Sequence, residues 1–333
     1  MNKILVSGMV VTAIVMLFFA NLAWGSVSIP MREVLGVIMS PTVESTNRYI
    51  ILESRLPATI VALLAGAALA TSGLLLQTAF RNPLAGPDVF GVSSGAALTV
   101  AIVMLSLGGN ITMGNYTLGG FLAVLVAAFV GAMAVMAVIT FFSAWVRNHT
   151  ILLIVGIMVG YLASSAISLL NFFSTAEGIK SYMVWGMGSF GNVSMSEVGS
   201  FAVLAITALL LSLLLIKPLN AMLLGEQYAE NLGVNIHRLR ILLLGVTGLL
   251  TAVVTAFCGP IAFIGLATPH IARLLMRTDN HRQLLPLTML LGAVIALLCN
   301  WLCSLPADGG IIPLNAVTPL FGAPVIIYVL VRR

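Results

Sequence analysis

The sequence predicts an all-α, polytopic membrane protein, and two observations indicate this fold class. Of the 333 residues, 60% are hydrophobic and only 8% are charged, whereas soluble domains have roughly 45–50% apolar and about 25% charged residues. Apolar stretches of about 20 residues, each long enough to cross a hydrocarbon core of about 30 Å, recur along the chain. The length allows about ten transmembrane helices, in a single transmembrane domain over residues 1–333.

Charged residues and clusters of Gly, Pro and Asn divide the chain into ten apolar segments. They cover approximately residues 4–24, 56–79, 91–107, 118–142, 151–172, 198–216, 241–258, 261–276, 284–303 and 312–330. The first is longer than the apolar core of a secretory signal, so we expect a membrane span and not a cleaved leader. The eighth is short and contains Gly259-Pro260, Gly265 and Pro269, so a re-entrant loop is the alternative there.

The distribution of lysine and arginine separates these alternatives, because short cytoplasmic loops are enriched in both. With ten crossings and a cytoplasmic N-terminus, the basic residues left outside are Arg32, Arg48, Arg55 and Lys180. If the eighth segment does not cross, five more basic residues move outside, namely Arg273, Arg277, Arg282, Arg332 and Arg333. Most of the positive charge would then lie on the outer side of the membrane, against this rule. Ten crossings with both termini cytoplasmic are therefore predicted.

Two connections are expected to form short amphipathic helices. In the outer joint, residues 25–55, Ser28-Ile29-Pro30 is a typical helix start, and an apolar face of Val34, Leu35, Ile38 and Met39 follows. In the cytoplasmic loop of residues 217–240, Leu224, Tyr228 and Leu232 lie at i, i+4 and i+8. Gly233 follows where a helix commonly ends in a left-handed glycine. This loop helix could bind a protein partner or rest on lipid headgroups.

Several functions are disfavoured by the polar residues. All ten acidic residues lie in loops or at span ends, whereas ion-coupled carriers usually keep an ionisable group near the midplane. The histidines, His149, His237, His270 and His281, lie far apart near cytoplasmic ends, so interfacial positions are expected and no metal site. The three cysteines are expected to be small buried hydrophobes. The net charge of +5 is not clustered, so no nucleic-acid partner is expected.

Catalytic chemistry is not indicated either. No compact cluster of His, Asp, Glu or Cys falls at one membrane depth, and the chain lacks the Gly-x-x-x-x-Gly-Lys-Ser/Thr pattern of an ATP-binding loop. We therefore expect no enzymatic activity and no cofactor in this chain. If ATP drives it, a separate subunit binds the ATP, and the helix around Glu226 to Leu232 would be the contact.

A row of polar residues marks the fifth apolar segment. Tyr161, Ser164, Ser165 and Ser168 lie at i, i+3, i+4 and i+7 on one helical face, with Asn171 near the outer end. Such a row could border a water-filled pathway. Small residues also permit close helix packing, as expected for Gly156-x-x-x-Gly160 just before it, so both interpretations remain open.

The loop after the second segment has an unusual composition. It reads Arg81-Asn-Pro-Leu-Ala-Gly-Pro-Asp88 and continues to Gly91-Val-Ser-Ser-Gly95. Two prolines restrict φ while the glycines permit tight turns and close backbone approach. A stiff hairpin is predicted, either as a simple connection or as a functional element.

Together these motifs resemble one family, the permease subunits of ABC importers for iron-siderophore, haem and cobalamin. The resemblance covers essentially the whole chain. It is carried by the loop just described and by five further motifs, Arg55-Leu-Pro57, Gly66-Ala-Ala-Leu-Ala70, Gly259-Pro-Ile-Ala-Phe-Ile-Gly265-Leu with Pro269-His270, Leu224-Gly-Glu through Leu232-Gly-Val, and Leu320-Phe-Gly-Ala-Pro324.

The resemblance implies a type II ABC importer permease fold in a bacterial inner membrane, and a homodimer with two ATPase subunits and an outer substrate-binding protein. Its pathway would include the row from Tyr161 to Asn171. Its cytoplasmic gate would include Asn82, Leu84, His149 and Thr150. Its ATPase-coupling element would include Gly225, Glu226, Tyr228, Ala229, Leu232 and Gly233. An iron-siderophore is the first expectation for the cargo, before haem or cobalamin; an ion-coupled secondary transporter is the alternative function.

The chain departs from the family pattern at two positions near the outer face. The family often has a second arginine after Leu-Pro, where this chain has Ala58. Another arginine, near the end of the ninth span, is replaced by Ser304. Docking of the binding protein is therefore expected to depend mainly on Arg55, with Arg48 or Lys180 as substitutes.

Overall fold

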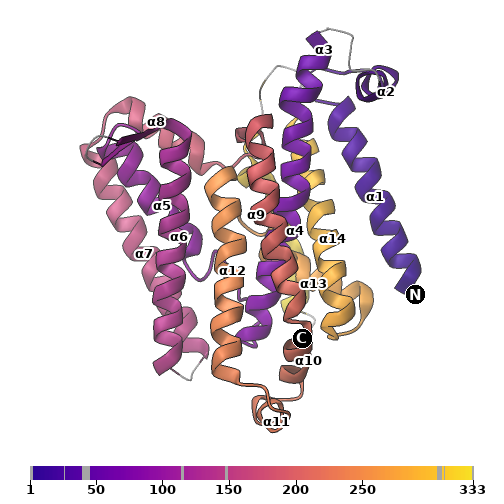
Figure 1. The fold of residues 1–333 in the computed structure, drawn as a ribbon, viewed down its shortest axis with the longest axis vertical. Coiled ribbons are helices and arrows are strands. Elements are labelled where there is room, and N and C mark those ends of the chain that lie inside the picture. The colour runs from indigo at the N-terminus through magenta and orange to yellow at the C-terminus, as the bar shows by residue number, and fades with distance from the viewer. Residues whose placement is uncertain are drawn as a thin grey trace.

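The computed structural model describes residues 3–25, 27–39, 46–113, 116–146, 149–305, 310 and 312–331, and these are almost entirely helical (Figure 1). Seven helical segments of the described chain are long and apolar enough to cross a membrane. They contain α1 (Lys3–Ala23), α4 (Leu56–Ala79), α6 (Gly120–Trp145), α7 (His149–Phe173), α9 (Met195–Leu214), α12 (Ile236–Cys258) and α14 (His281–Cys303).

Shorter helices complete the bundle and its two ends. Within the bundle these are α5 (Val92–Ala101), α13 (Ile264–Met276) and α15 (Leu314–Val331). One end carries α2 (Met31–Met39), α3 (Thr46–Tyr49) and α8 (Ala176–Gly186), and the other carries α10 (Ile216–Leu223) and α11 (Glu226–Asn231). Turns of π- or 3-10 helix cover Ile50–Arg55, Ile102–Ser106 and Phe190–Asn192.

The all-α prediction is confirmed, with one small addition. Each of the ten expected apolar segments coincides with a helix, and the expected outer amphipathic helix is α2. A short antiparallel hairpin, β1 (Asn110–Met113) and β2 (Tyr116–Gly119), follows two left-handed glycines that turn the chain, Gly108 and Gly109. Seven segments meet the length and hydropathy of a span, so ten crossings stay a prediction.

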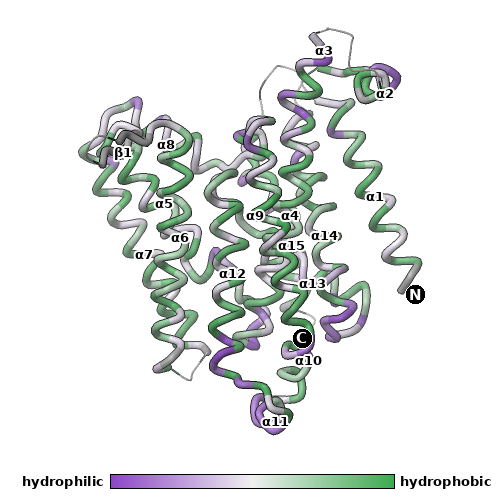
Figure 2. The backbone as a smooth tube through the Cα atoms, in the orientation of Figure 1, coloured by the Kyte–Doolittle hydropathy of each residue, from purple (hydrophilic) through white to green (hydrophobic). Residues whose placement is uncertain are grey.

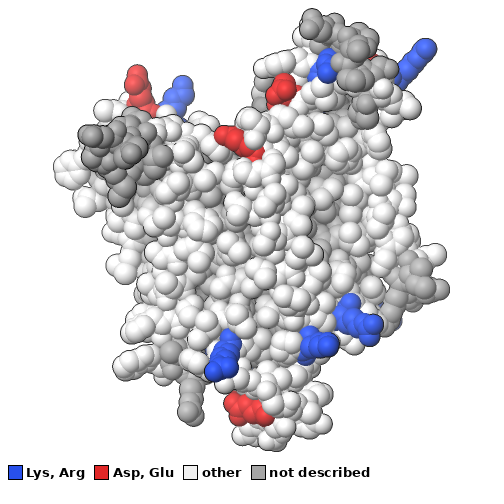
Figure 3. Space-filling view, viewed as in Figure 1, with Lys and Arg blue, Asp and Glu red and all other residues white. Residues whose placement is uncertain are grey.

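Polar residues are separated along the bundle as a membrane requires. Figure 2 shows apolar residues through the middle of the helices and hydrophilic residues near α2, near α3, and around α11. On the face shown in Figure 3, the charged side chains lie at the upper and lower edges, and the band between them is uncharged. Both ends of the chain lie in the half of the molecule that carries α10 and α11 (Figure 1).

Helix α4 forms the centre of the bundle and packs against α9, α12, α13 and α14. Two glycines set how closely its neighbours approach. A Cβ at Gly66 would overlap the carbonyl oxygen of Gly292 in α14, and a Cβ at Gly73 would overlap that of Gly265 in α13. Small residues are the usual means by which membrane helices bring their backbones together. The α4 contacts therefore depend on glycine at these positions.

The doubtful eighth segment is an extended stretch followed by a short helix. Gly259 (φ +77°) ends α12, and Phe263 (φ +68°) precedes α13. The backbone between them is satisfied by Asn315, whose Oδ1 accepts from the Ala262 N–H at 3.1 Å and whose Nδ2 donates to the Pro260 carbonyl at 2.7 Å. Non-helical backbone at membrane depth needs such partners within the protein.

Candidate translocation and coupling sites

The polar row on α7 lies on a largely uncovered face. Only 17% of the α7 span window is buried within the chain, and the side chain of Tyr161 is 67% exposed. Ser164, Ser165 and Ser168 are also exposed. Further along, Asn171 Oδ1 is buried with no hydrogen-bond partner. An apolar helix with an open polar row is chemically suited to line an aqueous path or to be covered by another chain.

The two small residues before this row accommodate both a helix, α5, as expected, and the loop that precedes it. Gly156 and Gly160 accommodate the loop that precedes α5, because a Cβ on Gly156 would lie 2.8 Å from the Cα of Phe90. Gly91, which has φ +73°, lies against the same two glycines. The loop therefore sits against Gly156, and the start of α5 packs beside Gly160, where a Cβ would lie 3.5 Å from Ser94 Oγ.

The loop from Arg81 to Gly91 is compact, as predicted. Asn82 Oδ1 accepts a hydrogen bond from the Leu84 N–H at 2.9 Å, and the Ala85 N–H donates to the Asn82 carbonyl at 3.1 Å. His270 of α13 lies with Nε2 2.8 Å from the Pro83 carbonyl oxygen, which accepts its proton. Leu84 is 37% exposed at the loop tip. This loop is thus held against both α7 and α13.

The other two candidate gate residues begin α7. Thr150 is exposed, and the side chain of His149 lies outside the described part of the chain. The contact of α7 with the loop is made one to two turns further along, at Gly156. His149 and Thr150 therefore lie on the helix that supports the loop of Asn82 and Leu84.

Asp88, at the end of this loop, is a carboxyl that the sequence did not single out. Its Oδ1 accepts from the Ser93 hydroxyl at 2.9 Å, and the backbone N–H of Phe263 also donates to the carboxyl group. Burial raises the pKa of Asp88 to about 6, and the two hydrogen bonds oppose this rise. The carboxyl therefore joins the start of α5 to the break before α13.

Asp88 should make stability depend on pH. Because its pKa is higher in the folded chain than the ordinary value of about 3.9, the folded state binds the proton more tightly and loses stability as pH rises from about 4 to 6. Asp88→Asn should therefore raise the apparent melting temperature at pH 8, by a stabilisation of about 1–3 kcal/mol, and this gain should shrink at pH 5. Parallel melting curves for both proteins across that range would contradict the assignment. Glu177→Gln, which changes an exposed carboxylate, is the control.

The predicted cytoplasmic helix is present as α11 and is shorter than its apolar row. Leu224, Tyr228 and Leu232 are 65%, 53% and 59% exposed, whereas Ala229 is fully buried. Gly225 (φ +115°) precedes the helix, and Gly233 (φ +85°) follows it as the expected left-handed glycine. Glu226 pairs with Arg240 of α12 at 3.3 Å. The row is therefore an exposed apolar surface at the polar end of the bundle.

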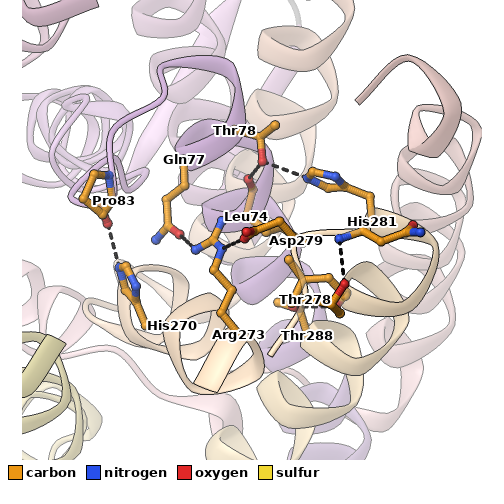
Figure 4. Close-up of polar contacts among 12 residues, drawn as sticks. Leu74, Gln77, Thr78, Pro83, His270, Arg273, Thr278, Asp279, His281 and Thr288 are labelled. Atoms are coloured by element: carbon orange, nitrogen blue, oxygen red, sulfur yellow. Dashed lines mark hydrogen bonds and ion pairs between the residues drawn. The ribbon is translucent and has the colours of Figure 1, made fainter. Parts of the chain in front are cut away.

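Behind α10 and α11 lies a polar cavity of about 400 Å³. Arg273 donates to Gln77 Oε1 at 2.5 Å and pairs with Asp279 at 3.4 Å (Figure 4). Beside it, His281 Nε2 lies 2.9 Å from Thr78 Oγ1. Two of the histidines expected at the membrane interface, His270 and His281, are instead buried and hydrogen-bonded. The sequence hinted at this polar cluster only through Gln77 and Thr78, two polar residues near the end of an apolar segment.

Arg55, the expected docking residue, faces the chain itself. Its Nη1 donates to the carbonyls of Leu22 and Ala23 at 2.8 and 2.9 Å, and its Nη2 donates to the Val27 carbonyl. It thereby satisfies carbonyl groups at the C-terminal end of α1, which have no partner within that helix. Arg55, Ala58 and Ser304 line one cavity of about 320 Å³. The three expected docking positions are thus close together, and the one cation among them is bound to backbone.

The remaining polar groups give no sign of a metal centre. Within the described residues, no three His, Cys, Asp or Glu side chains lie together as a metal site would need. Cys258, Cys299 and Cys303 are unpaired and buried, which confirms their expected role as small hydrophobes.

Comparison with known proteins agrees with this architecture. The sequence model of the FecCD transport family matches residues 13–332 of this chain. The hemin transport system permease protein HmuU of Yersinia pestis is 31% identical over 99% of this chain and 96% of its own length. The vitamin B12 import system permease protein BtuC of Escherichia coli O157:H7 is 37% identical over 84% of this chain and 82% of its own.

A solved structure is similar as well. It is described as a metal-chelate type ABC transporter in an inward-facing conformation, and it matches with a TM-score of 0.84 and 30% identity over 99% of both chains. The match extends over the whole bundle, including the broken eighth segment and the loop from Arg81 to Gly91. The chain therefore belongs to the FecCD transport family, the permease subunits of ABC importers that its motifs had indicated.

Proposed function

We propose that this chain forms the membrane path of an ABC importer for a metal chelate. The family match over residues 13–332 carries this proposal, and the relatives named for hemin and vitamin B12 support the class of cargo. Among metal chelates we place an iron-siderophore first, with haem and cobalamin as the alternatives. Membership of the family implies an ATPase subunit and a substrate-binding protein, and the chain itself performs no covalent chemistry.

The uncovered face of α7 supports a dimer with the pathway at its interface. A second copy of this chain would cover the apolar residues of α7, and the row from Tyr161 to Asn171 would line the water-filled centre. Hydroxyl groups and an amide are neutral hydrogen-bonding groups, which suit brief contact with a bulky cargo because a tight site would slow its release. On this proposal the exposed side chains of the row face the path, and Asn171, whose Oδ1 is buried within the chain, lies at its end.

At the cytoplasmic end we assign Asn82 and Leu84, with His149 and Thr150, to the gate. The loop that carries the first pair is supported on α7, the helix that begins with the second pair. A movement of α7 relative to α13 would therefore move the loop. Such rigid-body movement of packed helices is a usual means of exchanging outward- and inward-open cavities.

The coupling element is assigned to the segment from Gly225 to Gly233, with Glu226, Tyr228, Ala229 and Leu232 between them. Its exposed apolar row offers a surface for an ATPase subunit, of which we expect two copies per dimer. Both chain ends lie in the same half of the molecule as this segment (Figure 1). We therefore place the chain in the inner membrane with both termini and α11 in the cytoplasm.

The docking role of Arg55 is testable by charge reversal. Arg55→Glu should lower the ATPase stimulation by the binding protein roughly three- to tenfold, because the outer cavity loses its cation. Since Arg55 also binds the end of α1, a local structural effect must be separated from docking. Arg55→Lys keeps the charge and should retain most of the stimulation, and Arg48→Glu tests the substitute position. Full stimulation in Arg55→Glu would exclude the docking role.

Reconstitution tests the function as a whole. Proteoliposomes that contain the permease, its ATPase and its binding protein should take up the chelate that the binding protein retains, and only with internal ATP. Vesicles that contain the permease alone should take up none against a gradient. Uptake by the permease alone, driven by a pH gradient, would instead establish the ion-coupled alternative, which the family match does not favour.

A further inference from the structure

The α10–α11 segment is held to the bundle by two kinds of contact. Buried apolar side chains, Leu219 and Met222, pack against the body, and such contacts are non-directional and tolerate sliding. Directional contacts are made by Asn220 to the start of α14 and by Glu226 to Arg240 of α12. A longer contact joins Arg81 Nη2 to the Met222 carbonyl at 3.5 Å. A displacement of α11 would therefore be passed on most directly through these polar groups.

Asn220 is bound closely to the start of α14. Its Oδ1 accepts from the His281 backbone N–H at 2.8 Å and lies 3.2 Å from His281 Nδ1, and its Nδ2 donates to Asn280 Oδ1 at 3.0 Å. Asn280 already caps α14, because its Oδ1 also accepts from the Arg282 N–H. The imidazole of His281 is therefore not needed as a helix cap.

The opposite side of the same ring reaches α4. His281 Nε2 lies 2.9 Å from Thr78 Oγ1, and the His281 residue is 1% exposed. Because Asn220 Oδ1 can only accept, Nδ1 donates to it, and Nε2 of the neutral ring then accepts from the Thr78 hydroxyl. The Leu74 carbonyl also lies 2.9 Å from Thr78 Oγ1, so the hydroxyl proton is shared between these two acceptors (Figure 4). One buried side chain thus connects the α10–α11 segment with the last turn of α4.

The last turn of α4 leads directly into the loop from Arg81 to Gly91, which carries Asn82 and Leu84 and is called the gate loop below. Gln77, next to Thr78, receives the Arg273 guanidinium and donates to the Leu266 carbonyl of α13 at 3.1 Å. Its own carbonyl accepts from the Asn82 N–H at 3.2 Å. In Figure 4, residues 77 and 78 of α4 contact α13 on one side and α14 on the other. Movement of this turn must therefore move Asn82.

From these contacts we propose that His281 is a positioning residue that passes the displacement of α10–α11 to the end of α4 and to the gate loop. This inference rests on the proposed function, and it assigns a mechanical role to the connection Asn220–His281–Thr78. Hydrogen bonds act only at short range. When the donor–acceptor distance rises a few tenths of an ångström above about 3.2 Å, the bond weakens strongly. The three side chains can therefore transmit movement only while they stay within hydrogen-bond distance of one another.

The sharpest test removes the α4 side of the connection alone. Thr78→Val deletes the hydroxyl that faces His281, together with its bond to the Leu74 carbonyl of the same helix, and leaves the contact of His281 with Asn220. Thr78→Ser keeps the hydroxyl and should therefore keep the nucleotide-dependent movement of the gate loop. Thr288→Val is the matched control, because the Thr288 hydroxyl is also buried on α14 but donates only to Leu284 of its own helix, at 2.7 Å.

The readout is movement of the gate loop, which needs no knowledge of the cargo. Spin labels replace Leu84 and Trp145 in the permease–ATPase complex, and their distance distribution is compared without nucleotide and with ATP plus vanadate. We expect the population that shifts with nucleotide to fall about three- to tenfold in Thr78→Val, the range for loss of one hydrogen bond. It should be unchanged in Thr288→Val and restored in Thr78→Ser.

Each outcome decides a separate question. A full nucleotide-dependent shift in Thr78→Val would overturn the role of His281, as would a loss equally large in Thr288→Val. Failure of the unsubstituted permease to bind an ATPase at all would instead overturn the proposed function. If Thr78→Val also lowers the melting temperature, His281→Gln, which keeps polar groups at this position, repeats the test.

Discussion

Replacement of Leu232 by aspartate is expected to separate the ATPase subunit from the permease while the membrane helices stay folded. Leu232 is 59% exposed at the end of an apolar row, so its side chain makes little contribution to the stability of the chain alone. Covering a leucine in an interface is worth about 1.5–3 kcal/mol, and a carboxylate there would also be desolvated. The affinity should therefore fall about a hundredfold, for a loss of roughly 3 kcal/mol.

Co-purification of the ATPase with the detergent-solubilised permease measures this loss. Glu230→Gln is the control, because it changes the charge of the same short helix at an exposed position away from the row. The permease should keep its melting temperature in both variants, since exposed substitutions usually change stability by less than about 0.5 kcal/mol. Normal co-purification and normal transport with Leu232→Asp would show that the ATPase binds elsewhere.

The helices of this fold could be read from the sequence because each depends on local information. Apolar length predicted the position of every helix in the bundle, and the spacing of Leu224, Tyr228 and Leu232 predicted an exposed row that the structure contains. Gly233 was recognised by its position after that row. Such features are set by the period of a single helix and by its end, so one sequence suffices.

Contacts between distant segments could not be read in this way. The spacing of Gly156 and Gly160 predicted close packing but not its partners, which are the loop at Phe90 and Gly91 and the start of α5. Arg55 was expected to face outward as a docking cation, yet its guanidinium binds backbone carbonyls of α1. A helical period states which residues share a face, and the tertiary arrangement alone decides what covers it.

The burial of polar groups was missed for the same reason. Asp88 was counted among acids in loops, where water would solvate it, but its loop folds back against the break before α13. Gln77, Arg273 and His281 are distant in sequence and meet only because α4 and α13 end where α14 begins. These groups belong to the part of the molecule where the coupling and gate elements meet.

Replacement of Gly73 by alanine is expected to have the largest effect on folding. The added Cβ would overlap the Gly265 carbonyl oxygen, which is backbone and cannot rotate away. The clash can be relieved only by moving α13 from α4, and overpacking of this kind costs about 1–3 kcal/mol or more. The same shift would separate Gln77 from Arg273 and from the Leu266 carbonyl.

The matched control is Gly245→Ala in α12, where a Cβ meets nothing within 4 Å. Alanine is a better helix former than glycine by about 0.8–1.0 kcal/mol in a helix interior, so this variant should be as stable as the natural chain or more stable. The effect of each variant is measured by the yield of monodisperse protein and by its melting temperature in detergent. If Gly73→Ala behaves like Gly245→Ala, the close crossing of α4 and α13 is not what holds the gate loop in place, and the route from α11 to Asn82 loses its support at Gln77.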